Sequence, residues 1–129
     1  MTGTNNFQAP RRQAERRGRR AEFLAICLLR LKGYRLLASR YRTPVGEIDL
    51  IARRAGTVVF VEVKARATIA EATEAVTPHG RQRIARAAHL WLARNPAAAE
   101  FTLRFDVILV APRRWPRHLP GVFDADGAA

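Results

Sequence analysis

The sequence has 129 residues, of which 48% are hydrophobic, and its 23 lysines and arginines outnumber 11 aspartates and glutamates to give a net charge of +12. This length and hydrophobic content predict one globular domain, and the charge indicates a polyanionic partner, with nucleic acid favoured over an anionic membrane. No stretch reaches the roughly 20 apolar residues of a membrane span, and the arginine-rich N-terminal region does not resemble a secretory signal. We therefore expect a cytoplasmic protein. A single cysteine excludes an internal disulfide.

The N-terminal part of the chain predicts a basic arm followed by a helix. Residues 1–17 contain little to bury and many arginines, so we expect a mobile arm. Apolar residues at steps of three and four predict a helix over about 19–32, which Gly33 ends. We expect Cys27 to be a buried structural thiol of this helix. The predicted buried stripe comprises Ala21, Leu24, Ala25, Leu28 and Leu31.

The rest of the chain predicts a mixed α/β domain. The expected elements are a strand at 34–41, strands at 47–52 and 57–66, a loop or short helical turn at 67–76, a helix from Thr77 to Asn95, a strand at 101–111 and an irregular tail at 112–129. The two middle strands form an antiparallel hairpin, whereas the strand after the second helix can return parallel. The order α-β-β-β-α-β over 18–111 therefore predicts a mixed sheet flanked by helices.

The predicted hairpin concentrates charge on one face. Alternation along 57–66 places Glu62 and Lys64 on the same side of the sheet, and the same rule groups Glu47 with Asp49 on the neighbouring strand. A two-residue turn at Ala55-Gly56 would place Asp49 opposite Glu62 and Glu47 opposite Lys64. A bulge at the turn would shift this register.

Two carboxylates that face each other across a sheet repel unless a positive charge lies between them. A divalent cation fits this requirement, and carboxylate oxygens suit Mg²⁺ or Mn²⁺. Lys64, two residues beyond Glu62, can hold an attacking water or stabilise charge on a phosphate. The alternative is that these charges only form the solvent face of an antiparallel sheet.

The hairpin also resembles a known pattern. Asp49 followed by Glu62-Val63-Lys64 resembles the PD-(D/E)xK nuclease superfamily, whose members include restriction endonucleases and Holliday-junction resolvases. The wider segments 46–52 and 59–66 are similar to the YraN-type family of uncharacterised bacterial proteins, and the resemblance extends over about 18–110. It implies a restriction-endonuclease-like fold and metal-dependent hydrolysis of phosphodiester bonds, with DNA, branched DNA included, favoured over RNA.

The resemblance also assigns roles to individual residues. Asp49 and Glu62 would bind the metal, Lys64 would position the nucleophile, and Glu47 would orient Lys64 rather than bind metal. The position of Glu22 matches a helix glutamate that helps to complete the metal site in related resolvases. Pairing of Glu22 with a neighbouring arginine is an equal alternative. We expect Asp106, in the late strand, to have a structural role.

Arginines provide the expected contacts to nucleic acid, because phosphate contacts supply affinity without sequence information. The candidates are Arg16, Arg17, Arg19, Arg20, Arg66, Arg81, Arg83 and Arg86. The three histidines, His79, His89 and His118, lack metal-ligand spacing and are expected on the surface or in helix packing. The rival to a nuclease is a non-catalytic nucleic-acid-binding or ribonucleoprotein-associated module with the same fold. Junction resolvases act as dimers, which leaves a homodimer as an open alternative.

Overall fold

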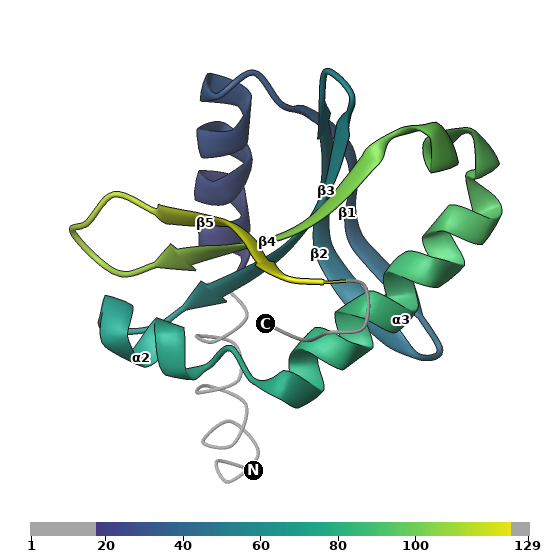
Figure 1. Cartoon of the computed structure of the whole chain (residues 1–129). Coiled ribbons are helices and arrows are strands. Elements are labelled where there is room, and N and C mark those ends of the chain that lie inside the picture. Colours follow the sequence, from purple (N-terminus) through teal and green to yellow (C-terminus); the bar gives the residue numbers. More distant parts are fainter. Residues whose placement is uncertain (1–17, 125–129) are drawn as a thin grey trace, which may run out of the picture.

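The computed structural model describes residues 18–124, so the expected basic arm at 1–17, with Arg16 and Arg17, lies outside the described residues. Its centre is one five-stranded sheet with the strand order β1-β2-β3-β4-β5 (Figure 1). The strands are β1 (Arg35–Thr43), β2 (Gly46–Arg54), β3 (Thr57–Ala65), β4 (Thr102–Val110) and β5 (Arg117–Phe123).

Helices precede the sheet and connect β3 to β4. The N-terminal helix covers described residues 18–31, and the connection contains α2 (Ile69–Glu74), α3 (Pro78–Arg94) and the short 3₁₀ helix η1 (Pro96–Glu100). The start of α3 is the predicted one: the Thr77 side chain accepts a hydrogen bond from the Gly80 amide, and Pro78 occupies the first turn. Within residues 18–124, no helix combines the length and the apolar character that crossing a membrane requires.

The sheet is mixed, as the sequence predicts. The pairs β1-β2, β2-β3 and β4-β5 are antiparallel, whereas β3 and β4 are parallel and are joined by the crossover through α2 and α3. The predicted restriction-endonuclease-like α/β fold is therefore confirmed. The predicted irregular tail is wrong over 117–123, where β5 forms an edge strand. The prolines and the glycine of this region made it resemble an irregular tail in the sequence, although proline is tolerated in an edge strand such as β5.

Two apolar clusters cover the two faces of the sheet. Phe60 and Phe105 pack with Trp91 and the other buried residues of α3 on one face. Val59 and Val61 pack with Ala25 and the rest of the N-terminal helix on the other. The alternation along β3 and β4 is the predicted one, so Glu62 and Lys64 share the face of Phe60.

The N-terminal helix differs from its predicted orientation. Its buried residues are Ala21, Ala25 and Leu29, whereas the predicted core residues Leu24 and Leu31 are 38% and 80% exposed. Cys27 is half-buried rather than buried. Small alanines let the helix lie close to the sheet, and the leucines on its flank remain in contact with solvent.

Gly46 fixes the position of α3 against the start of β2. A Cβ atom at Gly46 would lie 2.3 Å from the backbone carbonyl oxygen of Arg83, so only glycine permits this approach. The contact places the first half of α3 beside the hairpin that carries the predicted catalytic residues.

Candidate active site

The hairpin has the predicted turn and register up to the candidate site. Leu50 pairs with Val61 and Ile51 with Phe60, and Ala55, at φ 50°, begins the two-residue turn. The backbone pairing between β2 and β3 ends at Leu50, before it reaches the two predicted charged pairs, Asp49 with Glu62 and Glu47 with Lys64.

Beyond that point a side chain replaces the backbone pairing. Oδ2 of Asp49 accepts a hydrogen bond of 2.7 Å from the Val63 amide. Asp49 is therefore fixed to β3 beside Glu62, although the two residues are not a register pair. The predicted pairing of Glu47 with Lys64 is wrong, because β2 and β3 no longer pair at this level; Glu47 instead lies 3.4 Å from the guanidinium of Arg42.

Asp49 is held in an environment that disfavours its charge. Burial is the largest influence and raises its pKa, the hydrogen bond from Val63 lowers it, and the negative charges of Glu62 and Glu22 raise it further. Lys64 lowers it slightly, and the net result is a pKa of about 6. A cation beside this carboxylate would stabilise its charged form.

Glu62 is buried, and only one of its two carboxylate oxygens has a partner among the described residues. It is 5% exposed, and its Oε1 atom lies 3.1 Å from Nζ of Lys64. Its Oε2 atom is buried and has no hydrogen-bond partner within the described part of the chain. An unpartnered buried carboxylate oxygen costs free energy, so this atom is open to a ligand with positive charge or a donor group.

The first turn of α3 closes over Glu62. A Cβ atom on Gly80 would lie 3.6 Å from Oε1 of Glu62, which is an ordinary van der Waals contact. Arg81, the next residue, is half-buried, and its Nε atom also lacks a hydrogen-bond partner among residues 18–124. The guanidinium of Arg81 lies over the Phe123 ring, 5.9 Å from its centroid, whereas Arg83 and Arg86 are exposed on α3.

The other predicted arginines lie elsewhere on the surface. Arg19 and Arg20 are exposed on the N-terminal helix. Arg66 follows the end of β3 and donates a hydrogen bond of 2.7 Å to the Ala65 carbonyl.

Glu22 pairs with an arginine, but with one on β1 rather than with the neighbouring helix arginine of the sequence-based alternative. Oε2 of Glu22 accepts a hydrogen bond of 2.8 Å from Nε of Arg40, a β1 residue with φ 49°. Its charge still contributes to the raised pKa of Asp49. Within residues 18–124, no three His, Cys, Asp or Glu side chains converge closely enough to hold a metal ion.

The donor set for a cation is therefore the pair Asp49 and Glu62. Their residues fit Mg²⁺ or Mn²⁺ chemically, because both offer carboxylate oxygens and Glu62 has one buried oxygen without a partner. Mg²⁺ usually binds through one or two protein carboxylates and keeps several waters.

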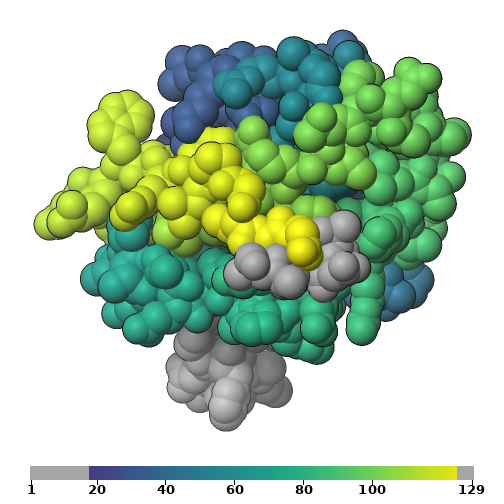
Figure 2. Space-filling view, viewed as in Figure 1, coloured from purple at the N-terminus to yellow at the C-terminus, as the bar shows by residue number. Residues whose placement is uncertain are grey.

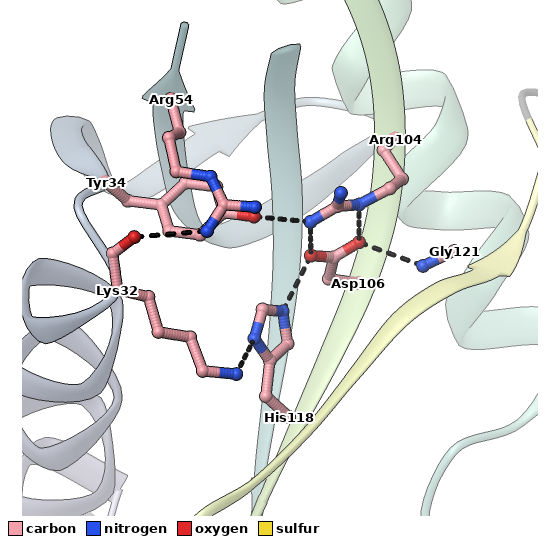
Figure 3. A network of polar contacts seen from close by, with 7 residues as sticks. All are labelled: Lys32, Tyr34, Arg54, Arg104, Asp106, His118 and Gly121. Atoms are coloured by element: carbon pink, nitrogen blue, oxygen red, sulfur yellow. Dashed lines mark hydrogen bonds and ion pairs between the residues drawn. The ribbon is translucent and has the colours of Figure 1, made fainter.

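A second polar cluster was not predicted. Asp106 is fully buried in β4, and Arg104 donates two hydrogen bonds of 2.8 Å to its carboxylate (Figure 3). His118 and the Gly121 amide, both in β5, also contact Asp106, at 2.7 and 3.0 Å. Burial alone would raise the pKa of Asp106, but the hydrogen bonds from Arg104, His118 and Gly121 lower it to about 2. The structural role predicted for Asp106 agrees with this geometry.

His118 connects this cluster to the end of the N-terminal helix. Its side chain is 3% exposed, and its Nδ1 atom lies 2.8 Å from Nζ of Lys32 (Figure 3). An ammonium group can only donate, so Nδ1 accepts and Nε2 donates to Asp106, which corresponds to a neutral imidazole. The prediction of a surface or helix-packing histidine is wrong for His118, which lies on a strand that the sequence concealed; His79 and His89 are exposed.

A restriction-endonuclease-like sheet with Asp49, Glu62 and Lys64 at the end of one hairpin defines an α/β domain of the endonuclease-like class. Residues 21–110 match the family model described as Uncharacterised protein family UPF0102. The chain therefore belongs to UPF0102, the YraN-type family that its two strand motifs indicated.

Relatives in other bacteria match over most of their length. The chain is 56% identical over 119 residues to a UPF0102 protein of Methylorubrum extorquens (strain PA1), covering 92% of this chain and 93% of the relative. It is 59% identical over 118 residues to a UPF0102 protein of Bradyrhizobium sp. (strain BTAi1), covering 91% and 87%. A UPF0102 protein of Chelativorans sp. (strain BNC1) is 55% identical over 115 residues, covering 89% and 93%.

Proposed function

We propose that the protein is a metal-dependent nuclease that hydrolyses phosphodiester bonds, with DNA favoured over RNA. The observation that carries the proposal is the unpartnered Oε2 atom of Glu62 beside Asp49, whose pKa is raised to about 6. The charged forms of a buried and a half-buried carboxylate arranged in this way would be stabilised by a divalent cation, which would also offset charge on a phosphate. The endonuclease-like fold supports the proposed nuclease activity, although a fold does not by itself determine a function.

Each residue of the site has a specific role in this proposal. Asp49 and Glu62 would hold Mg²⁺ or Mn²⁺, which would supply charge stabilisation and a more acidic water. Glu22 increases the negative field at Asp49 from its pair with Arg40. Lys64, anchored to Oε1 of Glu62, orients the attacking water or neutralises a phosphate oxygen.

Substrate binding rests on the positive charge of the chain. A net charge of +12 attracts a phosphate backbone, and the exposed guanidinium groups of Arg83 and Arg86 lie on the helix that covers the site. Arg81, in the first turn of α3 with its guanidinium over the Phe123 ring, is a further candidate for a phosphate contact.

The rival reading is a nucleic-acid-binding module without catalysis, and the Glu62 to Lys64 ion pair favours it, since lysine alone partly neutralises the buried acid. A cleavage screen separates the two. Single-stranded, duplex, flap and four-way-junction substrates are incubated with Mg²⁺ or Mn²⁺ and either the parent or Glu62→Gln. We expect metal-dependent cleavage by the parent alone. Cleavage that survives in Glu62→Gln reveals contamination, and binding without cleavage by the parent supports the rival.

A further inference from the structure

An open groove lies on the face of the sheet opposite Glu62 and Lys64. Its volume is about 770 Å³. The N-terminal helix forms one wall, the carboxyl ends of β3 and β4 form the floor, and the start of the β4-β5 connection forms the other wall. Figure 2 shows this connection, in yellow-green, projecting from the body of the molecule.

The walls of the groove carry large apolar side chains in contact with solvent. Trp115 is 84% exposed, and across the groove Leu31 and Leu24 are 80% and 38% exposed. These are the leucines that the sequence assigned to the core. A contiguous exposed apolar surface of this kind marks a binding site more often than a solitary exposed leucine does.

The charge around the groove has a single sign. The fifteen residues that line it include Arg20, Arg66, Arg113 and Arg114 and no aspartate or glutamate. Within the described chain, none of these four guanidinium groups forms an ion pair with a carboxylate. An apolar floor bordered by arginines that have no carboxylate partner among residues 18–124 is complementary to a ligand with flat rings and regularly spaced anionic groups.

A second hollow adjoins the groove at the β4-β5 connection. This hollow, of about 980 Å³, lies on the other side of the same connection and is lined by residues 67–70 and 111–117. Trp115 lines both hollows. Arg66 stands two residues beyond Lys64, on the order of 7 Å along an extended chain. An elongated ligand can therefore occupy the groove and reach the end of the strand that carries Glu62 and Lys64.

We propose that this groove binds unpaired nucleotides, with bases stacked on Trp115 and phosphates paired with the surrounding arginines. The inference rests on the proposed nuclease function and narrows its substrate to nucleic acid with a single-stranded segment. Stacking on an aromatic side chain requires an exposed base face, which a continuous duplex presents only at its ends. A stacked base accounts for an indole that is 84% exposed.

The test is equilibrium binding without catalysis. Fluorescein-labelled single strands and duplexes of the same length are titrated in EDTA with the parent, Trp115→Ala and Trp115→Phe, and heparin serves as a polyanion without bases. The matched control is Phe23→Ala, which removes another exposed aromatic ring, 64% exposed, outside the groove. Circular dichroism checks that every variant is folded.

We expect Trp115→Ala to weaken single-strand binding by about 5- to 150-fold, the range for loss of one stacked base, with Trp115→Phe in between and heparin affinity unchanged. Binding of single strands should also quench the tryptophan fluorescence of the parent but not that of Trp115→Phe. Equal losses for single strands, duplex and heparin would overturn the proposal, as would an unchanged affinity in Trp115→Ala. Dissociation of a dimer by Trp115→Ala, or binding of anionic vesicles in place of oligonucleotides, would also overturn it and assign the groove to another partner.

These outcomes separate the groove from the proposed catalysis. A parent that binds single strands through Trp115 but never cleaves supports the groove and contradicts the nuclease. A parent that cleaves normally while Trp115→Ala binds and cleaves like the parent contradicts only the groove.

Discussion

The carboxylate of Asp49 accepts the amide hydrogen of Val63 at 2.7 Å, at the level where β2 and β3 stop pairing. A side chain of one strand thus completes the hydrogen bonding of the other where the two strands separate. The arrangement fixes Asp49 beside Glu62, and this proximity together with burial keeps the pKa of Asp49 near 6.

The raised pKa predicts how Asp49 affects stability. Because the folded protein binds this proton more tightly than the unfolded chain, the contribution of Asp49 to folding is fully present below pH 4 and declines as the pH rises through about 6. Asp49→Asn removes this decline and retains an acceptor for the Val63 amide. We expect the free energy of unfolding of Asp49→Asn, relative to that of the parent, to be higher at pH 8 than at pH 4 by about 1–3 kcal/mol. Urea unfolding at both pH values measures it, and an equal difference at the two pH values would contradict the raised pKa.

Lys64→Met should separate catalysis from metal binding. The variant keeps much of the length of the side chain but lacks the ammonium group beside Glu62. We expect cleavage to fall by about 100- to 1000-fold, as for loss of one electrostatic stabiliser, while Mn²⁺ affinity is retained or increases. Asp49→Ala should lose both. Isothermal titration with Mn²⁺ and a cleavage assay test the pair, and an equal loss of metal affinity in the two variants would contradict these roles.

Asp106 should stabilise the fold without affecting cleavage chemistry. Replacing it with alanine leaves Arg104 and His118 without their buried acceptor, at a cost of about 3–5 kcal/mol. Its pKa is lowered to about 2, so its stabilising contribution is present above about pH 4 and is lost as the pH falls through about 2. Denaturant titration at pH 7 gives the cost, with Glu74→Ala, an exposed acid of α2, as control. A loss below about 1 kcal/mol would contradict the proposed role.

Gly46→Ala should separate α3 from the hairpin. The new methyl group would meet the Arg83 carbonyl at 2.3 Å, and overpacking of this kind costs about 1–3 kcal/mol. Gly56→Ala is the matched control, because a Cβ atom there has no neighbour within 4 Å among the described residues. Thermal melts should show a lower melting temperature for Gly46→Ala than for Gly56→Ala, and equal melting temperatures would contradict the close approach of α3.

Local patterns predicted the hairpin and the capping of α3, because each depends on neighbouring residues. The sequence allowed a parallel return of β4 because a helix separates this strand from β3. The local patterns failed where contacts between residues distant in sequence determine which side chains are buried or paired. Leu24 and Leu31 have helical spacing suited to a core, but the sheet accepts the smaller side chains of Ala21 and Ala25. His118 gains its partners from elements that lie far from it in sequence.

The candidate site shows the same division. Alternation along β3 placed Glu62 and Lys64 on one face. Nothing in the sequence indicated that Glu22 would pair with Arg40, because this arginine comes from a strand 18 residues away. No local rule indicated that backbone pairing would stop at Leu50, so the predicted contact between Glu47 and Lys64 was wrong.

The proposed function requires Asp49 and Glu62 to bind a divalent cation together, and thermal melting with and without Mn²⁺ measures this binding. The parent is compared with Asp49→Asn and Glu62→Gln, and the measurement needs no known substrate. A cation that binds only the folded state stabilises it by mass action, about 2.7 kcal/mol at 100 times the dissociation constant. We expect the melting temperature to rise by several degrees with Mn²⁺ in the parent and to change little in either variant. A parent that does not respond to Mn²⁺ or Mg²⁺, or variants that respond as strongly as the parent, would contradict the proposed cation binding.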